Sequence, residues 1–126
     1  MTAHLRAKTA YSAPLQAAIR TPRSIEYDIF AQVTARLKQA GADPKTGFPV
    51  LAAALHDNRK LWTALAADVA EAGNSLPEAL RAQLFYLAEF TNAHTRKILS
   101  GTETPEILVE INTSVMRGLS NAGLTT

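Results

Sequence analysis

Apolar residues recur along this chain every three or four positions, the spacing of one face of an α-helix. Four stretches show the pattern, at residues 22–40, 49–72, 76–100 and 105–121. The apolar positions of the four stripes are Ile25, Ile29, Val33 and Leu37; Leu51, Leu55, Trp62, Leu65 and Val69; Leu80, Leu84, Leu87 and Ile98; and Leu108, Ile111, Val115 and Leu119. The pattern therefore predicts four main helices.

Start and stop signals mark the ends of these stretches. Thr21-Pro22 and Thr104-Pro105 each place proline at the first helical position, where it is well tolerated. Ser75 and Glu78 have the spacing of a capping box, in which the two side chains bond free N–H groups of the first turn. Each stripe is also followed by a glycine, which tolerates the left-handed conformation that ends many helices, at Gly41, Gly73, Gly101 and Gly123.

Short connections between consecutive helices favour antiparallel neighbours. We therefore expect an all-α fold, a small antiparallel helical bundle of four main helices plus a short N-terminal helix. The bundle domain is expected over residues 21–123, and residues 1–20 are expected to form a basic N-terminal arm or the short helix. Leu5, Tyr11, Leu15 and Ile19 fit one helical face there, but Pro14 should break or kink such a helix.

Charge is distributed unevenly, although the net charge is only +2. Four basic residues precede Glu26, the first acidic residue of the chain: Arg6, Lys8, Arg20 and Arg23. Two interpretations stay open for this basic arm. It is either a solvated tail, or it contacts nucleic acid or an acidic partner.

The residues that usually carry catalysis or bind metal ions are sparse and scattered. The chain has no cysteine, which excludes disulfides and zinc–sulfur sites. His4, His56 and His94 are isolated from one another and from any carboxylate cluster. No nucleophile–base pair and no glycine-rich phosphate loop is visible. We therefore expect no catalytic residues, no metal, no cofactor and no enzymatic activity; without about 20 consecutive apolar residues, we also expect no membrane insertion.

Three polar residues interrupt the apolar stripes: Asn58, His94 and Asn112. An unsatisfied buried polar group costs about 1–3 kcal/mol, so these side chains need partners in backbone, water, a ligand or one another. Buried asparagine in a helix seam commonly fixes the register between helices. That role and a ligand-binding role are the two alternatives.

The predicted helix at residues 76–100 is apolar on more than one side, because Phe85 and Tyr86 point away from its stripe. Either the helix is central and covered all round, or these residues form an exposed aromatic strip that accepts an amphipathic partner helix. Trp62 is expected to pack in the core.

Taken in order, several short stretches resemble the flagellar biosynthesis regulator FlaF family of alphaproteobacteria. They are Pro22-Arg23-x-x-Glu26-Tyr27, Ala54-Leu55-x-x-Asn58-x-x-Leu61-Trp62, Asn74-Ser75-Leu76-Pro77-x-x-Leu80-Arg81-Ala82, and Ile111-Asn112 with Gly118-Leu119. No single stretch is specific, but their order and spacing together are. The resemblance covers nearly the whole chain.

The resemblance implies a cytoplasmic, non-enzymatic regulator of flagellum assembly that promotes flagellin synthesis and secretion. It implies action alongside a second regulator, FlbT, which is tied to flagellin mRNA. Flagellin ends are amphipathic helical segments, so a helical protein that hides their apolar face as a chaperone is the favoured form. Post-transcriptional control of flagellin mRNA with FlbT, or a scaffold for the export machinery, are the alternatives.

The resemblance also selects residues. Its motif residues Asn58, Leu61, Trp62, Leu76 and Pro77, with His94 and Asn112 of the stripes, are expected to be structural, and Pro77 to mark a helix start. Two partner-binding surfaces are expected. One comprises Phe85 and Tyr86 with Arg81, and the other Arg23, Tyr27 and Phe30.

Overall fold

Four helices make up the part of the chain that this computed structural model describes, which is residues 22–42 and 47–125, with side chains for 27–42 and 47–118. They are α3 (Pro22–Ala42), α4 (Gly47–Ala70), α5 (Glu78–Leu99) and α6 (Glu106–Thr125). There is no strand in these two ranges, which confirms the expected all-α fold of four main helices. The arm or short helix expected over residues 1–20 lies outside the described residues.

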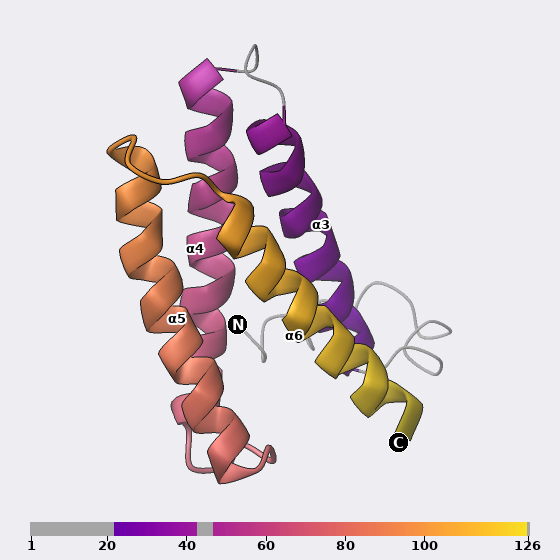
Figure 1. Ribbon diagram of the computed structural model, residues 1–126. Coiled ribbons are helices and arrows are strands. Elements are labelled where there is room, and N and C mark those ends of the chain that lie inside the picture. The colour runs from indigo at the N-terminus through magenta and orange to yellow at the C-terminus, as the bar shows by residue number, and fades with distance from the viewer. Residues whose placement is uncertain (1–21, 43–46, 126) are drawn as a thin grey trace, which may run out of the picture.

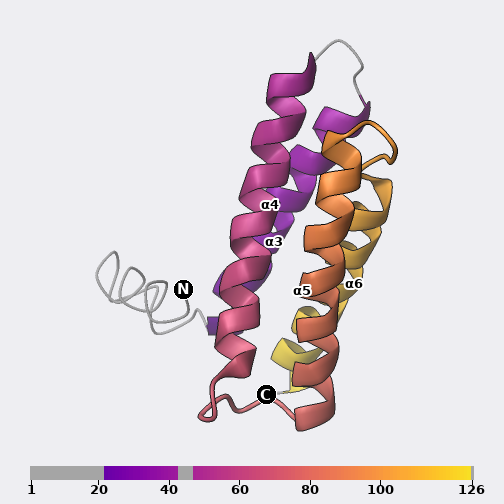
Figure 2. The same ribbon diagram turned by 90° about the vertical axis from the view of Figure 1, so that its left-hand side faces the viewer.

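Consecutive helices run in opposite directions (Figure 1). α4 packs on α3 and α5, and α3 packs on α4 and α6. α6 crosses diagonally over α4 and runs away from α5 toward the start of α3. The start of α3 and the turn between α4 and α5 lie toward the same end of the molecule (Figure 2).

The expected capping box at the start of α5 is wrong. Pro77 stands at the N-cap position of α5, and the helix has no side-chain cap hydrogen bond. Asn74 organises the turn instead, because its Oδ1 accepts the backbone N–H of Leu76 at 2.9 Å and its Nδ2 donates to the carbonyl oxygen of Asp68 at 3.1 Å. Ser75 is left exposed to solvent.

Glycine ends one helix as expected but not all of them. Gly101, just past α5, has a left-handed φ of 85°. α3 continues through Gly41 to Ala42, and α6 continues through Gly123 to Thr125, so these two glycines do not stop their helices. Gly41 meets a packing requirement, because a Cβ atom there would lie 2.9 Å from Cγ of Pro105, which stands just ahead of α6.

The core consists of two apolar clusters at different heights in the bundle. The first cluster contains Leu37, Ala40, Ala54, Leu55, Ile98 and Leu108. The second cluster contains Phe30, Val33, Leu61, Trp62 and Ala88. Phe30 and Trp62 meet edge to face, with ring centroids 5.7 Å apart and an angle of 85° between the planes, an arrangement that aromatic pairs favour.

A layer of buried polar side chains separates the two clusters. On α3, α4 and α5 these residues fall between the positions that feed the first cluster and those that feed the second. The layer consists of Thr34, Asn58, Thr91, His94, Thr95 and Asn112. The interior is therefore not a continuous apolar seam, and the hydrogen bonds of this layer decide how the helices are held at mid-height.

Candidate functional site

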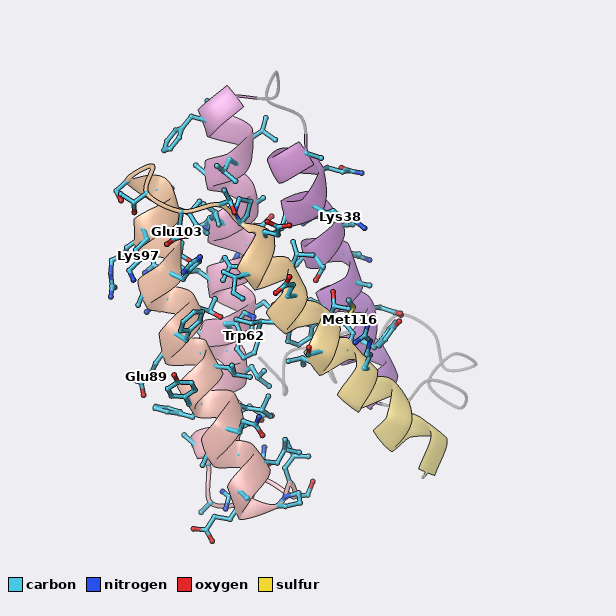
Figure 3. All side chains as sticks on the ribbon, viewed as in Figure 1. Lys38, Trp62, Glu89, Lys97, Glu103 and Met116 are labelled. Carbon is cyan, nitrogen blue, oxygen red and sulfur yellow. The ribbon has the colours of Figure 1, made fainter. Side chains whose placement is uncertain are left out.

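Asn58 and Asn112 of the polar layer and Trp62 of the second cluster form a hydrogen-bonded chain between α4 and α6. Trp62 Nε1 donates to Asn112 Oδ1 at 2.8 Å, and Asn112 Nδ2 donates to Asn58 Oδ1 at 2.8 Å. Asn58 and Asn112 are both fully buried, and Trp62 is 1% exposed. In Figure 3 Trp62 lies between α5 and α6 in the middle of the bundle. The two asparagines therefore bond to each other, which is one of the partners that the sequence analysis allowed for them.

The polar layer also holds side-chain atoms with no hydrogen-bond partner among the described residues. They are Thr34 Oγ1, Asn58 Nδ2, Thr91 Oγ1 and His94 Nε2. The His94 ring is covered by Phe90, which stacks on it with centroids 5.5 Å apart and planes 14° from parallel. His94 is thus buried in the α5 stripe, as its position in the sequence indicates.

A groove of about 180 Å³ lies between α4 and α5 beside this layer. Its apolar part is formed by the Trp62 indole, Ala66 and Ala88, and Phe85 lines it from α5. Polar side chains complete the lining: Arg59 and Thr63 from α4, and Glu89, Thr91 and Asn92 from α5. Because alanines stand where larger residues would fill the helix interface, space is left beside the indole.

Phe85 and Tyr86 belong to different surfaces. Adjacent residues on a helix point about 100° apart. Phe85 is 42% exposed and lines the α4–α5 groove, whereas Tyr86 is 66% exposed and does not line it. Both are therefore exposed rather than covered, but they do not form the single aromatic strip that the sequence suggested.

The second expected surface is wrong for Phe30. This residue is only 1% exposed, because α3 directs it into the second cluster against Trp62. Tyr27, one turn earlier, is 38% exposed. Arg23 lies in α3, but its side chain is outside the described part.

Arg81, which was expected to share a partner-binding surface with Phe85 and Tyr86, is half-buried. Its Nη1 lies 3.5 Å from the carbonyl oxygen of Glu71, at the limit of a hydrogen bond, and joins α5 to the end of α4. Leu76 is half-buried in the same turn, and Pro77 precedes the first residue of α5. Leu61, Trp62 and Asn58 are buried, so these motif residues lie in the interior.

The His, Asp and Glu residues are dispersed over the described side chains. No group of three or more His, Cys, Asp or Glu residues that could hold a metal ion occurs among them. An ion pair between Arg36 Nη1 and Asp57 Oδ2, 3.1 Å apart, links α3 to α4 at the surface. Of the helices described, none has the length and hydropathy needed to cross a membrane.

Comparison with known families identifies the family of this chain. The family of flagellar protein FlaF matches residues 7–119 of the chain. The chain belongs to the FlaF family. Searches of curated proteins and of solved structures find no match. The FlaF match begins at residue 7, ahead of α3, and ends at residue 119, within α6. The part of the sequence that this FlaF protein shares with its family therefore includes residues that precede the described bundle.

The groove and part of the polar layer were not predicted from the sequence. Ala66 and Ala88 create the groove, but alanine is so common in helices that neither residue stands out in the sequence. Thr34 falls four residues after Phe30, so its stripe position was a usable signal for burial. The signal in α5 was clearer, since Thr91 occupies a stripe position between Leu87 and His94.

Proposed function

We propose that this FlaF protein promotes flagellum assembly by binding amphipathic helical segments of flagellin, as a chaperone-like protein of the cytoplasm. The family supports a flagellar role. The observation that carries the proposal is the exposed Phe85 side chain beside the apolar α4–α5 groove. An amphipathic helix binds by inserting apolar side chains into such a groove.

The size of the groove favours a side-chain anchor over a small-molecule ligand. Its volume of about 180 Å³ lies below the range of roughly 300–1,000 Å³ that is typical of small-molecule sites. Exposed aromatic residues next to an apolar hollow are common anchors of protein interfaces. We therefore assign to the groove one or two aliphatic side chains of the flagellin segment, with Phe85 packing against the same helix.

Charges at the groove supply an orientation for the bound helix. Arg59 on α4 and Glu89 on α5 both line it and are both exposed. Glu89 points outward from α5 in Figure 3. A flagellin segment with an acidic residue on the Arg59 side and a basic residue on the Glu89 side pairs with both, and the reversed helix places like charges together.

The test uses purified full-length protein, flagellin with and without its C-terminal segment, and no RNA. Binding is measured by isothermal titration calorimetry for wild type, Phe85→Ala and Tyr86→Ala. Phe85→Ala is expected to weaken binding about thirtyfold, the effect of losing one anchor residue. Tyr86→Ala is the matched control, since it removes an exposed aromatic residue outside the groove, and is expected to leave affinity within about twofold.

Other outcomes contradict the assignment. Loss of affinity confined to Tyr86→Ala moves the partner to the other face of α5. Equal binding of flagellin with and without its C-terminal segment removes the amphipathic end as the ligand. No binding at all contradicts the chaperone role and leaves the export-machinery scaffold.

Control of flagellin mRNA together with FlbT is the second candidate function. It is favoured by the basic side chains of Arg6, Lys8, Arg20 and Arg23, which precede the first acidic residue. Binding through phosphate contacts weakens steeply with salt. RNA binding that is lost on deletion of residues 1–20 while flagellin binding is retained supports this candidate.

A further inference from the structure

A second stripe of residues runs along α5, on the side that faces away from the core. Its residues follow one another at steps of four and three positions, the spacing of a helix side that packs against another helix. All of them are exposed, and the two rings in the middle, Tyr86 and Phe90, are 66% and 36% exposed. We call this set the outer strip: Ala79, Gln83, Tyr86, Phe90, Ala93 and Lys97.

Charged side chains of both signs border the outer strip. Glu89 precedes Phe90, Arg96 precedes Lys97, and all three charged residues are exposed. In Figure 3 Glu89 and Lys97 project from the side of α5 that lies away from α6. No ion pair includes Glu89, Arg96 or Lys97 within residues 27–42 and 47–118, whose side chains the structure describes. These charges are therefore available to pair with another molecule.

We propose that the outer strip is the interface of a two-fold symmetric dimer, in which α5 packs antiparallel against α5 of a second copy. In a two-fold interface every contact occurs twice, with the two partners exchanged. When Phe90 faces Ala93 of the second copy, Ala93 therefore faces Phe90 in return. The same alignment sets Tyr86 against Lys97 of the second copy, again twice.

The shapes of the facing residues are complementary in this alignment. The small side chain of Ala93 leaves room for the ring of Phe90, which is already held in place by stacking on His94 with centroids 5.5 Å apart. Lys97 can lay its aliphatic stem along the ring of Tyr86 and place its ammonium group over the ring face. Each large ring therefore meets a small or flexible residue.

The charges select this alignment over its neighbours. Residues that flank a helix–helix seam set the orientation and partner of the two helices through ion pairs. Here Glu89 comes beside Arg96 of the second copy, and symmetry forms the pair twice. A shift by one heptad, which would set Tyr86 against Phe90, brings Glu89 beside Glu89. A parallel arrangement places Lys97 against Lys97 within the strip. Charge complementarity thus favours a second copy in one antiparallel register.

The size of the contact indicates a weak dimer. The strip from Gln83 to Lys97 spans roughly 20 Å of helix, and a single pair of helices lies at the low end of specific interfaces. Both core clusters are built from helices of one copy, so the bundle does not need the dimer in order to fold. We therefore expect an equilibrium between monomer and dimer.

The test is sedimentation equilibrium of the purified full-length protein alone, for wild type, Glu89→Arg, Arg96→Glu and an equimolar mixture of the two variants. Each single variant brings like charges together twice, and its dissociation constant is expected to rise about tenfold. In the mixed dimer both pairs again join an acidic to a basic residue. The mixture is therefore expected to associate within about threefold of wild type.

Lys60→Glu is the matched control, because it reverses an exposed positive charge on α4, outside the outer strip. Its dissociation constant is expected to stay within about twofold of wild type. A wild-type protein that remains monomeric up to about 1 mM overturns the inference. So does a mixture that associates no better than the single variants, because self-association then uses another surface.

This inference is independent of the flagellin proposal, although Glu89 borders both surfaces. The dimer is measured on the protein alone, so a failure of flagellin binding leaves the sedimentation result unchanged. Arg96 does not line the α4–α5 groove. Arg96→Glu is therefore expected to weaken the dimer and to leave flagellin affinity within about twofold of wild type.

Discussion

The side-chain amide nitrogen of Asn112 lies 2.8 Å from Oδ1 of Asn58, and this hydrogen bond joins α6 to α4 in the centre of the molecule. Asn112 accepts a second bond from the Trp62 indole at the same place. Neither asparagine is reached by solvent. Water does not compete for these buried hydrogen bonds. A shift of α6 by one turn would therefore leave the polar groups of Asn58, Trp62 and Asn112 buried without partners.

Replacing Asn112 by leucine is therefore expected to lower the free energy of unfolding by about 2–4 kcal/mol, because two buried groups lose their partners at once. The measurement is urea unfolding followed by Trp62 fluorescence. Ser114→Leu on the exposed side of the same helix is the control, with an expected change within about 0.5 kcal/mol. A loss below 1 kcal/mol for Asn112→Leu would show that the pair adds little to stability.

The double variant Asn58→Leu with Asn112→Leu measures the coupling between the two asparagines in the free energy of unfolding. With both amides removed, only the Trp62 N–H is left without a partner. The double variant is therefore expected to be more stable than the sum of the single losses by about 1–2 kcal/mol. Strict additivity of the two losses would mean that the asparagines act independently.

The helices and the burial of the two asparagines were predictable from the sequence, but their pairing was not. Spacing of three and four residues reports only which side of one helix is apolar. It does not say which helix lies opposite, and Asn58 meets Asn112 because α6 crosses α4 while packing mainly on α3. The register between helices depends on packing between distant parts of the chain.

The role of Gly41 differs from the one that its position in the sequence suggests. A glycine near a helix end suggests a stop, but here it allows Pro105 to approach the α3 backbone. Gly41→Ala places a methyl group 2.9 Å from the proline ring, and its expected cost is about 1–3 kcal/mol even though alanine favours helices. Thermal unfolding measures the change.

Gly118→Ala is the matched control for that variant. Gly118 lies within α6, and a Cβ atom there would meet nothing within 4 Å. The same substitution is expected to stabilise the protein by about 0.5–1 kcal/mol, through helix propensity alone. Equal effects at the two glycines would contradict the close approach of Pro105.

The turn between α4 and α5 gives a prediction that reverses the one drawn from sequence. The capping-box spacing predicts that Ser75 matters, whereas Asn74 holds the turn through its bonds to Leu76 and Asp68. Asn74→Ala is therefore expected to cost about 1 kcal/mol of unfolding free energy, and Ser75→Ala less than about 0.5 kcal/mol. Urea unfolding of both variants decides between the two interpretations. A larger loss of unfolding free energy for Ser75→Ala than for Asn74→Ala would support the capping box.

The candidate site was only partly predictable, for a related reason. Exposure of an aromatic residue depends on how many helices surround its own. Phe85 stays exposed because it lines the open groove beside the α4–α5 contact, and Phe30 is buried because α3 packs against both α4 and α6. Nothing in the local sequence of either residue records these neighbours.

Truncation to alanine should therefore cost much more stability at Phe30 than at Phe85. Phe30→Ala removes a ring that is 1% exposed and packed on Trp62, with an expected loss of about 3–5 kcal/mol in unfolding free energy. Phe85→Ala removes a ring that is 42% exposed, and its expected loss is below about 1.5 kcal/mol, leaving a folded protein in which binding is measurable. Urea unfolding gives both values. If Phe85→Ala proves as destabilising as Phe30→Ala, the ring belongs to the core, and a loss of flagellin binding in that variant would report unfolding rather than a lost anchor.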